Sequence, residues 1–162
     1  MIVRSFAPIA APNAHILILG SMPGIASLEA GQYYAHSRNA FWPIMGALFG
    51  AAPDLPYTER VARLKDEGVA VWDVLQACER EGSLDSSIRA EVPNDFAGFF
   101  AAYPKIRRIG LNGGKAAASF RKHAGHCPPA GAEVHALPST SAAHAARGLE
   151  DKCAIWRVAL LS

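Results

Sequence analysis

Residues 16–42 read ILILGSMPGIASLEAGQYYAHSRNAFW, and the fold can be predicted outward from this stretch. Its first four residues, 16–19, are aliphatic, and Gly20 ends the run. A short apolar run of this kind is typical of a strand that is buried on both faces of a parallel sheet. Gly20 and Gly24 then allow the backbone to turn sharply and to approach a ligand closely.

The remainder of the stretch collects polar and aromatic side chains just after this strand. Ser21 and Ser27 contribute hydroxyl groups, Tyr33 and Tyr34 contribute rings, and Asn39 precedes a segment that Pro43 marks as the start of a helix. Ligands of open α/β sheets bind at the carboxyl ends of the strands. We therefore expect a binding site at this end of residues 16–19.

Composition favours an ordinary globular protein. The chain has 162 residues, 51% of them hydrophobic and 19% charged, with a formal net charge of +2. We expect a single domain covering residues 1–162. The small positive charge permits a polyanionic partner without requiring one. Three widely spaced cysteines contain no CxxC pair, so we expect no metal site, no iron–sulfur cluster and no other cofactor.

The same cysteine usage suits a reducing cytoplasm, and neither a signal peptide nor a membrane span is expected. We expect a monomer.

Strands alternate with helices along the chain. The predicted strands cover residues 16–19, 69–75, 105–111 and 133–137. The predicted helices cover residues 41–49, 59–67 and 115–124, a segment after Asn94 or Asp95, and residues 149–161. Residues 1–15 read as an irregular arm and residues 82–94 as a polar loop. This alternation predicts an α/β protein, a three-layer α/β/α sandwich around a four-stranded, mainly parallel sheet.

Parallel strands bring their carboxyl ends to one edge, so the segments that follow them should meet. Asp73 lies near the end of one strand, Asn112 ends another, and residues 138–141 follow the last. Each of these side chains also has an ordinary structural explanation. Asn39 could cap a helix, Asp73 could be a solvated residue at a strand end, and Asn112 precedes a glycine as turn residues do.

Five segments taken together resemble the uracil-DNA glycosylase superfamily. They are GSMPG at residues 20–24, YY at 33–34 with RNAFW at 38–42, VWDVL at 71–75, GLNG at 110–113, and LPSTS at 137–141. The resemblance covers roughly residues 16–147 and is strongest to the hypoxanthine-DNA (deoxyinosine) glycosylase branch. It implies a monofunctional glycosylase that hydrolyses the N-glycosidic bond of a deaminated base, hypoxanthine, during base excision repair.

The resemblance also assigns roles to residues. Asn39 and Asp73 are the expected catalytic residues, and either could place the attacking water. Asn39 is also expected to steady a developing cation, and Asp73 to accept a hydrogen bond from the N1–H of the base. The expected base pocket comprises Gly20, Ser21, Met22, Pro23, Tyr34, Phe41 and Asn112. The expected DNA contacts are Gly24, Ser27, Arg38, Ser139, Thr140, Ser141, His144 and Arg147. The expected partner is DNA that contains a deaminated base.

Two positions depart from the superfamily pattern and leave alternatives open. Met22 stands where other branches place a polar residue that holds the attacking water, and Leu137 replaces the histidine of the second motif. The substrate base could therefore be uracil, as in a mismatch-type enzyme, or the protein could bind damaged DNA without turnover. A flavodoxin-like binder of small nucleotides is a weaker alternative. Among residues 142–145, only His144 could wedge into a duplex.

Overall fold

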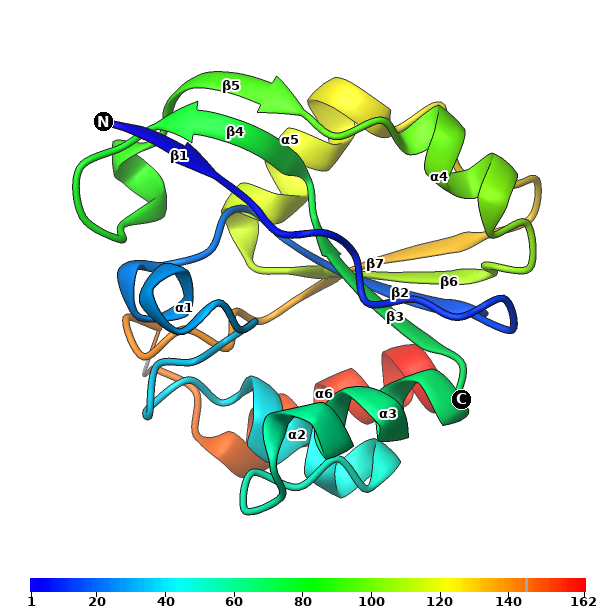
Figure 1. Cartoon of the computed structure of the whole chain (residues 1–162). Helices are drawn as coiled ribbons and strands as arrows, with labels where there is room; N and C mark the ends of the chain where they lie inside the picture. Colours follow the sequence, from blue (N-terminus) through cyan, green and yellow to red (C-terminus); the bar gives the residue numbers. More distant parts are fainter. Residues whose placement is uncertain (145) are drawn as a thin grey trace.

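The computed structural model describes residues 1–144 and 146–162, and it confirms the α/β/α sandwich (Figure 1). The central sheet contains four parallel strands in the order β3–β2–β6–β7. These strands are β2 (Ile16–Gly20), β3 (Val69–Asp73), β6 (Arg108–Asn112) and β7 (Glu133–Leu137). Every residue of β2 and β3 is buried, which explains why both strands read as nearly continuous apolar runs.

The register of the sheet decides which residues meet at its carboxyl edge. Gly20 pairs with Asp73 across β2 and β3, and Asn112 pairs with Leu137 across β6 and β7. The ends of all four strands therefore lie side by side, as the alternation of strands and helices predicted.

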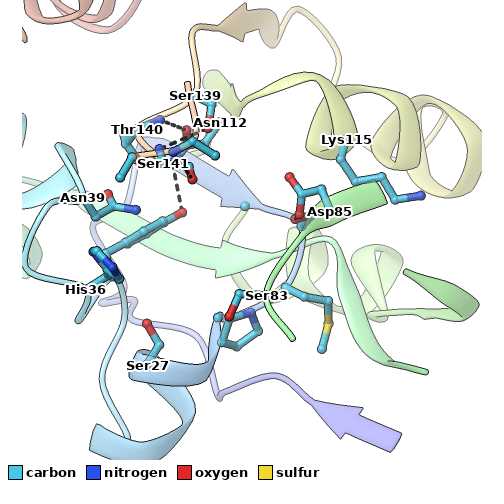
Figure 2. A pocket seen from close by; sticks show the side chains of 18 of the residues that line it. Ser27, His36, Asn39, Ser83, Asp85, Asn112, Lys115, Ser139, Thr140 and Ser141 are labelled. Carbon is cyan, nitrogen blue, oxygen red and sulfur yellow. Dashed lines mark hydrogen bonds between the residues drawn. The ribbon is translucent and has the colours of Figure 1, made fainter. Parts of the chain in front are cut away.

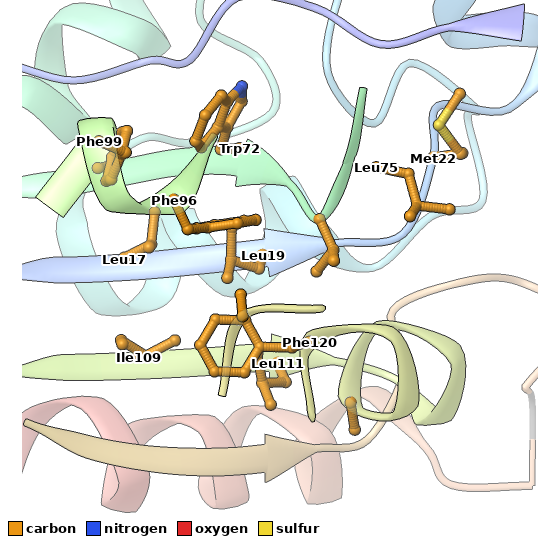
Figure 3. Packing of buried hydrophobic residues seen from close by; sticks show 14 of the residues in the cluster. Leu17, Leu19, Met22, Trp72, Leu75, Phe96, Phe99, Ile109, Leu111 and Phe120 are labelled. Atoms are coloured by element: carbon orange, nitrogen blue, oxygen red, sulfur yellow. The ribbon is translucent and has the colours of Figure 1, made fainter. Parts of the chain in front are cut away.

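Helices cover both faces of this sheet (Figure 1). On one face lie α2 (Phe41–Phe49), α3 (Tyr57–Asp66) and α6 (Leu149–Leu161), and on the other lie α4 (Phe96–Ala102) and α5 (Gly114–Ala124). Each layer encloses its own apolar cluster. Figure 3 shows the cluster that contains Trp72, Phe96 and Phe120, while Phe41 and Trp156 are fully buried in the other.

A second, antiparallel sheet corrects three sequence predictions. It contains β1 (Ile2–Arg4), β4 (Leu75–Glu79) and β5 (Arg89–Pro93), in the order β1–β4–β5. Residues 1–15 are thus not wholly irregular, and residues 82–94 are not wholly a loop. The predicted strand at 69–75 in fact covers parts of two strands: β3 ends at Asp73, and β4 begins at Leu75. These two strands belong to different sheets. The helix α1 (Ile25–Ala30) was also not predicted.

The physical reason for these errors is that the missed elements have weak local signals. β1 is three residues long, and β5 reads RAEVP, with charged residues and a proline that suit only an edge strand. Their pairing with β4 is a tertiary interaction that propensity does not encode. No helix in the described part of the chain is both long enough and apolar enough to cross a membrane.

Gly46 in α2 provides a test of the packing between this helix and the turn after it. A Cβ at Gly46 would lie 2.9 Å from the Cα of Ala52 and 3.4 Å from Cδ of Pro53. Alanine inside a helix normally stabilises it by ~1 kcal/mol relative to glycine. Because the clash is with backbone, we expect Gly46→Ala to lower the free energy of unfolding instead, by about 1–3 kcal/mol.

Urea denaturation would measure this difference. Gly114→Ala is the control, because a Cβ at Gly114 meets no atom within 4 Å. A Gly46→Ala protein that is more stable than the parent would contradict the close approach of α2 to the backbone of Ala52.

Candidate functional site

A cavity of about 730 Å³ opens at the carboxyl edge of the parallel sheet (Figure 2). Its walls come from residues 20–27, 33, 34, 36, 38, 39, 83–86, 112, 114, 115 and 139–144, together with Asp73. All five segments that resembled superfamily motifs contribute residues to this lining. The volume falls within the ~300–1,000 Å³ that small-molecule sites usually have, so it is large enough for a nucleobase.

Gly20 allows two functional side chains to reach the end of β2. A Cβ at this position would lie 2.6 Å from Oδ1 of Asp73 and 2.8 Å from the hydroxyl of Tyr34. Both oxygens therefore converge over a glycine, at a place where any larger residue would displace them. This close approach explains the glycine at the start of the first motif.

Asp73 is a buried carboxyl group on the cavity wall, with 3% of its surface exposed. Its Oδ2 atom has no hydrogen-bond partner among the described residues. Burial raises the pKa of Asp73 to about 7; the Asp85 carboxylate adds to this rise, and the Arg80 guanidinium opposes it. Near neutral pH the group can therefore either accept or donate a hydrogen bond to a ligand.

Asn112 holds the loops around the cavity in place. Its Nδ2 donates to the hydroxyl of Tyr34 (3.2 Å) and to Oγ1 of Thr140 (3.0 Å), and its Oδ1 accepts from the backbone N–H of Thr140 (3.0 Å). The ring of Tyr34 stacks on Phe41, with 4.0 Å between ring centroids. Burial raises the pKa of Tyr34, so its hydroxyl keeps a proton that it can donate.

Asn39 lies half-buried on the cavity wall, next to the start of α2. Its Oδ1 accepts a hydrogen bond of 2.9 Å from the N–H of Phe41, as in an Asx turn. Figure 2 shows its amide nitrogen directed toward the interior of the cavity. Asn39 thus acts as a turn residue and not as the helix cap, which is Ala40, and its amide nitrogen remains available for a ligand.

Most of the other residues that the sequence assigned to the base pocket or to DNA binding line the cavity, and two do not. Ser21, Met22, Pro23, Gly24 and Arg38 line the cavity, as do Ser139, Thr140, Ser141 and His144. Phe41 is fully buried behind Tyr34 and is not part of the lining, and neither is Arg147, which is exposed. Met22 also packs into the apolar cluster of Figure 3.

The three serines that the sequence assigned to DNA binding accept hydrogen bonds from backbone N–H groups. The hydroxyl of Ser27 accepts from Ala35 N–H (3.0 Å), that of Ser139 from Ser141 N–H (3.1 Å), and that of Ser141 from Ala143 N–H (3.2 Å). Ser27 is buried, so its effect on the site is to fix the turn that carries Tyr34. Ser139 and Ser141 are half-exposed and each retains a hydroxyl proton that can be donated.

Sequence reasoning missed the segment 80–87, of which residues 83–86 line the cavity. Buried Arg80 donates to the carbonyl of Pro23 (2.6 Å) and to that of Gly82 (2.8 Å). Ser21 donates to Asp85 (2.6 Å), and Ser83 accepts from the N–H of Ile25 (2.9 Å). This segment, rich in serine and glycine, has no periodic pattern. A lone arginine directly after β4 is the one signal that could have indicated a buried contact.

Lys115 is a cationic residue of the cavity that is already paired. It forms an ion pair with Glu91, which also contacts His123 at 3.0 Å. Burial alone would raise the pKa of Glu91, but the hydrogen bonds from Lys115 and His123 lower it to about 2. Within the described residues, no three histidine, cysteine or acidic side chains are grouped so that they could hold a metal ion.

Comparison with known proteins gives consistent results. The family described as the uracil DNA glycosylase superfamily matches residues 7–159. A Methanosarcina acetivorans protein named hypoxanthine DNA glycosylase is 39% identical over 149 residues, 89% of each chain. A Methanosarcina barkeri protein of the same name is 36% identical over 113 residues, 69% of this chain and 72% of its own. A solution NMR structure from M. acetivorans, described as a candidate uracil DNA glycosylase, superposes with a TM-score of 0.80 at 36% identity and 98% coverage of both chains.

The raised pKa of Asp73 predicts how stability depends on pH. Between its ordinary value of 3.8 and about 7, the folded chain holds this proton more tightly than the unfolded chain does. The free energy of unfolding therefore falls as the pH rises through that window. Asp73→Asn cannot ionise, so we expect the melting temperature of the variant, relative to the parent, to rise between pH 4 and pH 8.

Calorimetry across this range would measure the effect, with Asp54→Asn at an exposed turn as the matched control. A constant difference in melting temperature across the range would mean that Asp73 is already ionised at low pH.

Proposed function

This chain belongs to the uracil DNA glycosylase superfamily, and from that membership we propose that it removes hypoxanthine from DNA by hydrolysing the N-glycosidic bond. The observation that carries the proposal is the carboxyl group of Asp73, buried in a cavity of nucleobase size with one oxygen unpartnered among the described residues. The names of the two Methanosarcina relatives support hypoxanthine as the base.

Base recognition follows from the groups at the cavity wall. An extruded hypoxanthine presents an N1–H donor, and ionised Asp73 is an acceptor for it. The hydroxyl of Tyr34 lies over the same glycine and can donate to an acceptor on the base. Uracil also presents an N–H donor, so Asp73 alone does not separate the two bases, and their relative rates must be measured.

The chemical step requires water and an electron-accepting base. As the bond from C1′ to the base breaks, its electron pair moves to the base, and the sugar gains oxocarbenium character before water adds to C1′. The water loses a proton as its oxygen bonds to C1′, and the departing base gains a proton from solvent, so the products are the free base and an abasic site. Asn39 contributes a fixed amide, because its Oδ1 is held by the N–H of Phe41. Its amide nitrogen can donate to the oxygen of the attacking water and so orient it. Positioning and preorganised dipoles of this kind are the main resources of a site without a strong base.

Within this proposal the protein acts as a monomer on damaged DNA. Its cysteines are free among the described residues, which suits a reducing compartment such as the cytoplasm. The product is an abasic site, and strand cleavage follows only when alkali is added.

The proposed function predicts cleavage of a duplex that contains one hypoxanthine. We expect alkali-dependent strand breaks at the hypoxanthine, faster than at uracil in the same sequence context, measured by gel electrophoresis of a labelled strand. An undamaged duplex is the control. Binding without any abasic product would instead identify a non-catalytic binder of damaged DNA, and faster cleavage at uracil would reassign the substrate.

Asn39→Ala tests the catalytic step separately from folding. We expect the single-turnover rate on the hypoxanthine duplex to fall ~10²-fold, the scale observed when one preorganised polar group is removed. The loss of the hydrogen bond to Phe41 should lower stability by only about 1 kcal/mol. Asn13→Ala, at an exposed side chain that donates to the carbonyl of Lys65, is the matched control. A rate within threefold of the parent would contradict the proposed role of Asn39.

A further inference from the structure

Two large apolar side chains are exposed at the rim of the cavity. Leu84 is 60% exposed and Ile25 is 45% exposed, and both belong to the cavity lining. The N–H of Ile25 donates to the hydroxyl of Ser83 (2.9 Å), so the two residues lie on segments that are held together. Both side chains are therefore accessible to whatever binds at this rim of the cavity.

The segment that carries Leu84 is firmly anchored on both sides. Before it, Arg80 donates to the carbonyls of Pro23 and Gly82. After it, Asp85 accepts from Ser21 at 2.6 Å, and the carbonyl of Leu84 accepts from the N–H of Ser87 at 3.0 Å. Because the loop is already ordered, little conformational entropy is lost when its tip binds a partner. An apolar side chain on such a support can penetrate a surface rather than fold back.

The charge of this segment excludes the phosphate backbone as its contact. Residues 81–87 include two acids, Glu81 and Asp85, and no lysine or arginine. Arg80, just before them, is buried and has donated to carbonyl groups. Acidic side chains repel phosphates, whereas leucine is among the residues that insert between stacked bases. The tip therefore suits nucleobases rather than the sugar–phosphate chain.

The opposite rim lacks a comparable side chain. Residues 139–144 read STSAAH, so the loop of the second motif carries small residues and His144 only. Extrusion of a base leaves a gap in the stack that collapses unless a side chain fills it. Among the described residues of the rim, Leu84 and Ile25 are the exposed aliphatic side chains large enough for this task.

We propose that Leu84, flanked by Ile25, inserts into the base stack beside the extruded nucleotide and keeps the duplex open during the reaction. The wedge thus comes from the segment between β4 and β5 and not from the loop of the second motif. This inference rests on the proposed function, since it assumes a duplex from which a base has been extruded.

The test compares Leu84→Ala with the parent on hypoxanthine in a duplex and in a single strand. A wedge matters only where a stack must be held open, so we expect a loss of ~10-fold in the single-turnover rate on the duplex and less than twofold on the single strand. Leu84→Met should retain the duplex rate, because it preserves apolar bulk. Leu149→Ala, at an exposed leucine of α6, is the matched control, and His144→Ala tests the other rim.

A second measurement does not depend on cleavage. 2-Aminopurine placed next to the target nucleotide becomes fluorescent when it is unstacked. We expect binding of the parent to raise its fluorescence, and we expect Leu84→Ala to abolish at least half of that rise.

An equal loss of rate on both substrates would show that Leu84 only lines the base pocket, and no loss on either would remove it from the mechanism. A duplex-specific loss in His144→Ala alone would assign the wedge to the other loop. If the parent cleaves neither substrate, the proposed function fails, and the fluorescence measurement alone decides whether Leu84 unstacks the duplex.

Discussion

The side-chain amide of Asn112 is the interaction on which the geometry of the site depends. It ends the buried strand β6, and hydrogen bonds join its amide group to Tyr34 of the first motif and to Thr140 of the second. The carbonyl of Thr140 then accepts from the N–H of Ala40, 2.9 Å away, directly after Asn39. The rigid end of β6 thus holds Thr140, and Thr140 in turn holds the backbone next to Asn39, the residue to which we assign the chemistry. Sites supported in this way are more precise than sites on free loops.

A second constraint is electrostatic. Burial and the neighbouring Asp85 carboxylate raise the pKa of Asp73, and the Arg80 guanidinium offsets only part of this rise. Both neighbouring charged groups have other hydrogen-bond partners: Asp85 accepts from Ser21, and Arg80 donates to the backbone carbonyls of Pro23 and Gly82. Asp73 is left without a compensating hydrogen bond to its Oδ2 within the described residues. A well-packed structural acid would be paired, so this arrangement favours a ligand as the missing partner.

The sequence predicted those parts of the fold whose signals are local. The runs at β2 and β3 are apolar up to their last residues, Gly20 and Asp73, so their burial could be predicted. A parallel sheet then required Asp73 and Asn112 to lie at the same edge. By contrast, β5 carries Arg89 and Glu91, and it forms a strand only because the chain leaves the parallel sheet after Asp73 and continues as its partner β4. The wall formed by residues 80–87 was missed for the same reason, because its shape depends on contacts with residues 21–25 that are far away in sequence.

The two departures from the superfamily motifs have a common physical explanation. Leu137 is 5% exposed, and its Cδ1 lies 2.8 Å from the place where a Cβ on Gly110 would stand. It therefore fills the space above a glycine in the adjacent strand, within the cluster that contains Trp156. Met22 packs in the cluster on the other face. Both motif positions thus contribute to the core, and an imidazole at 137 would lose this packing. Polar chemistry in the cavity then falls to Asn39 and Asp73, whose amide and carboxyl groups can orient water and match a base edge without a motif histidine.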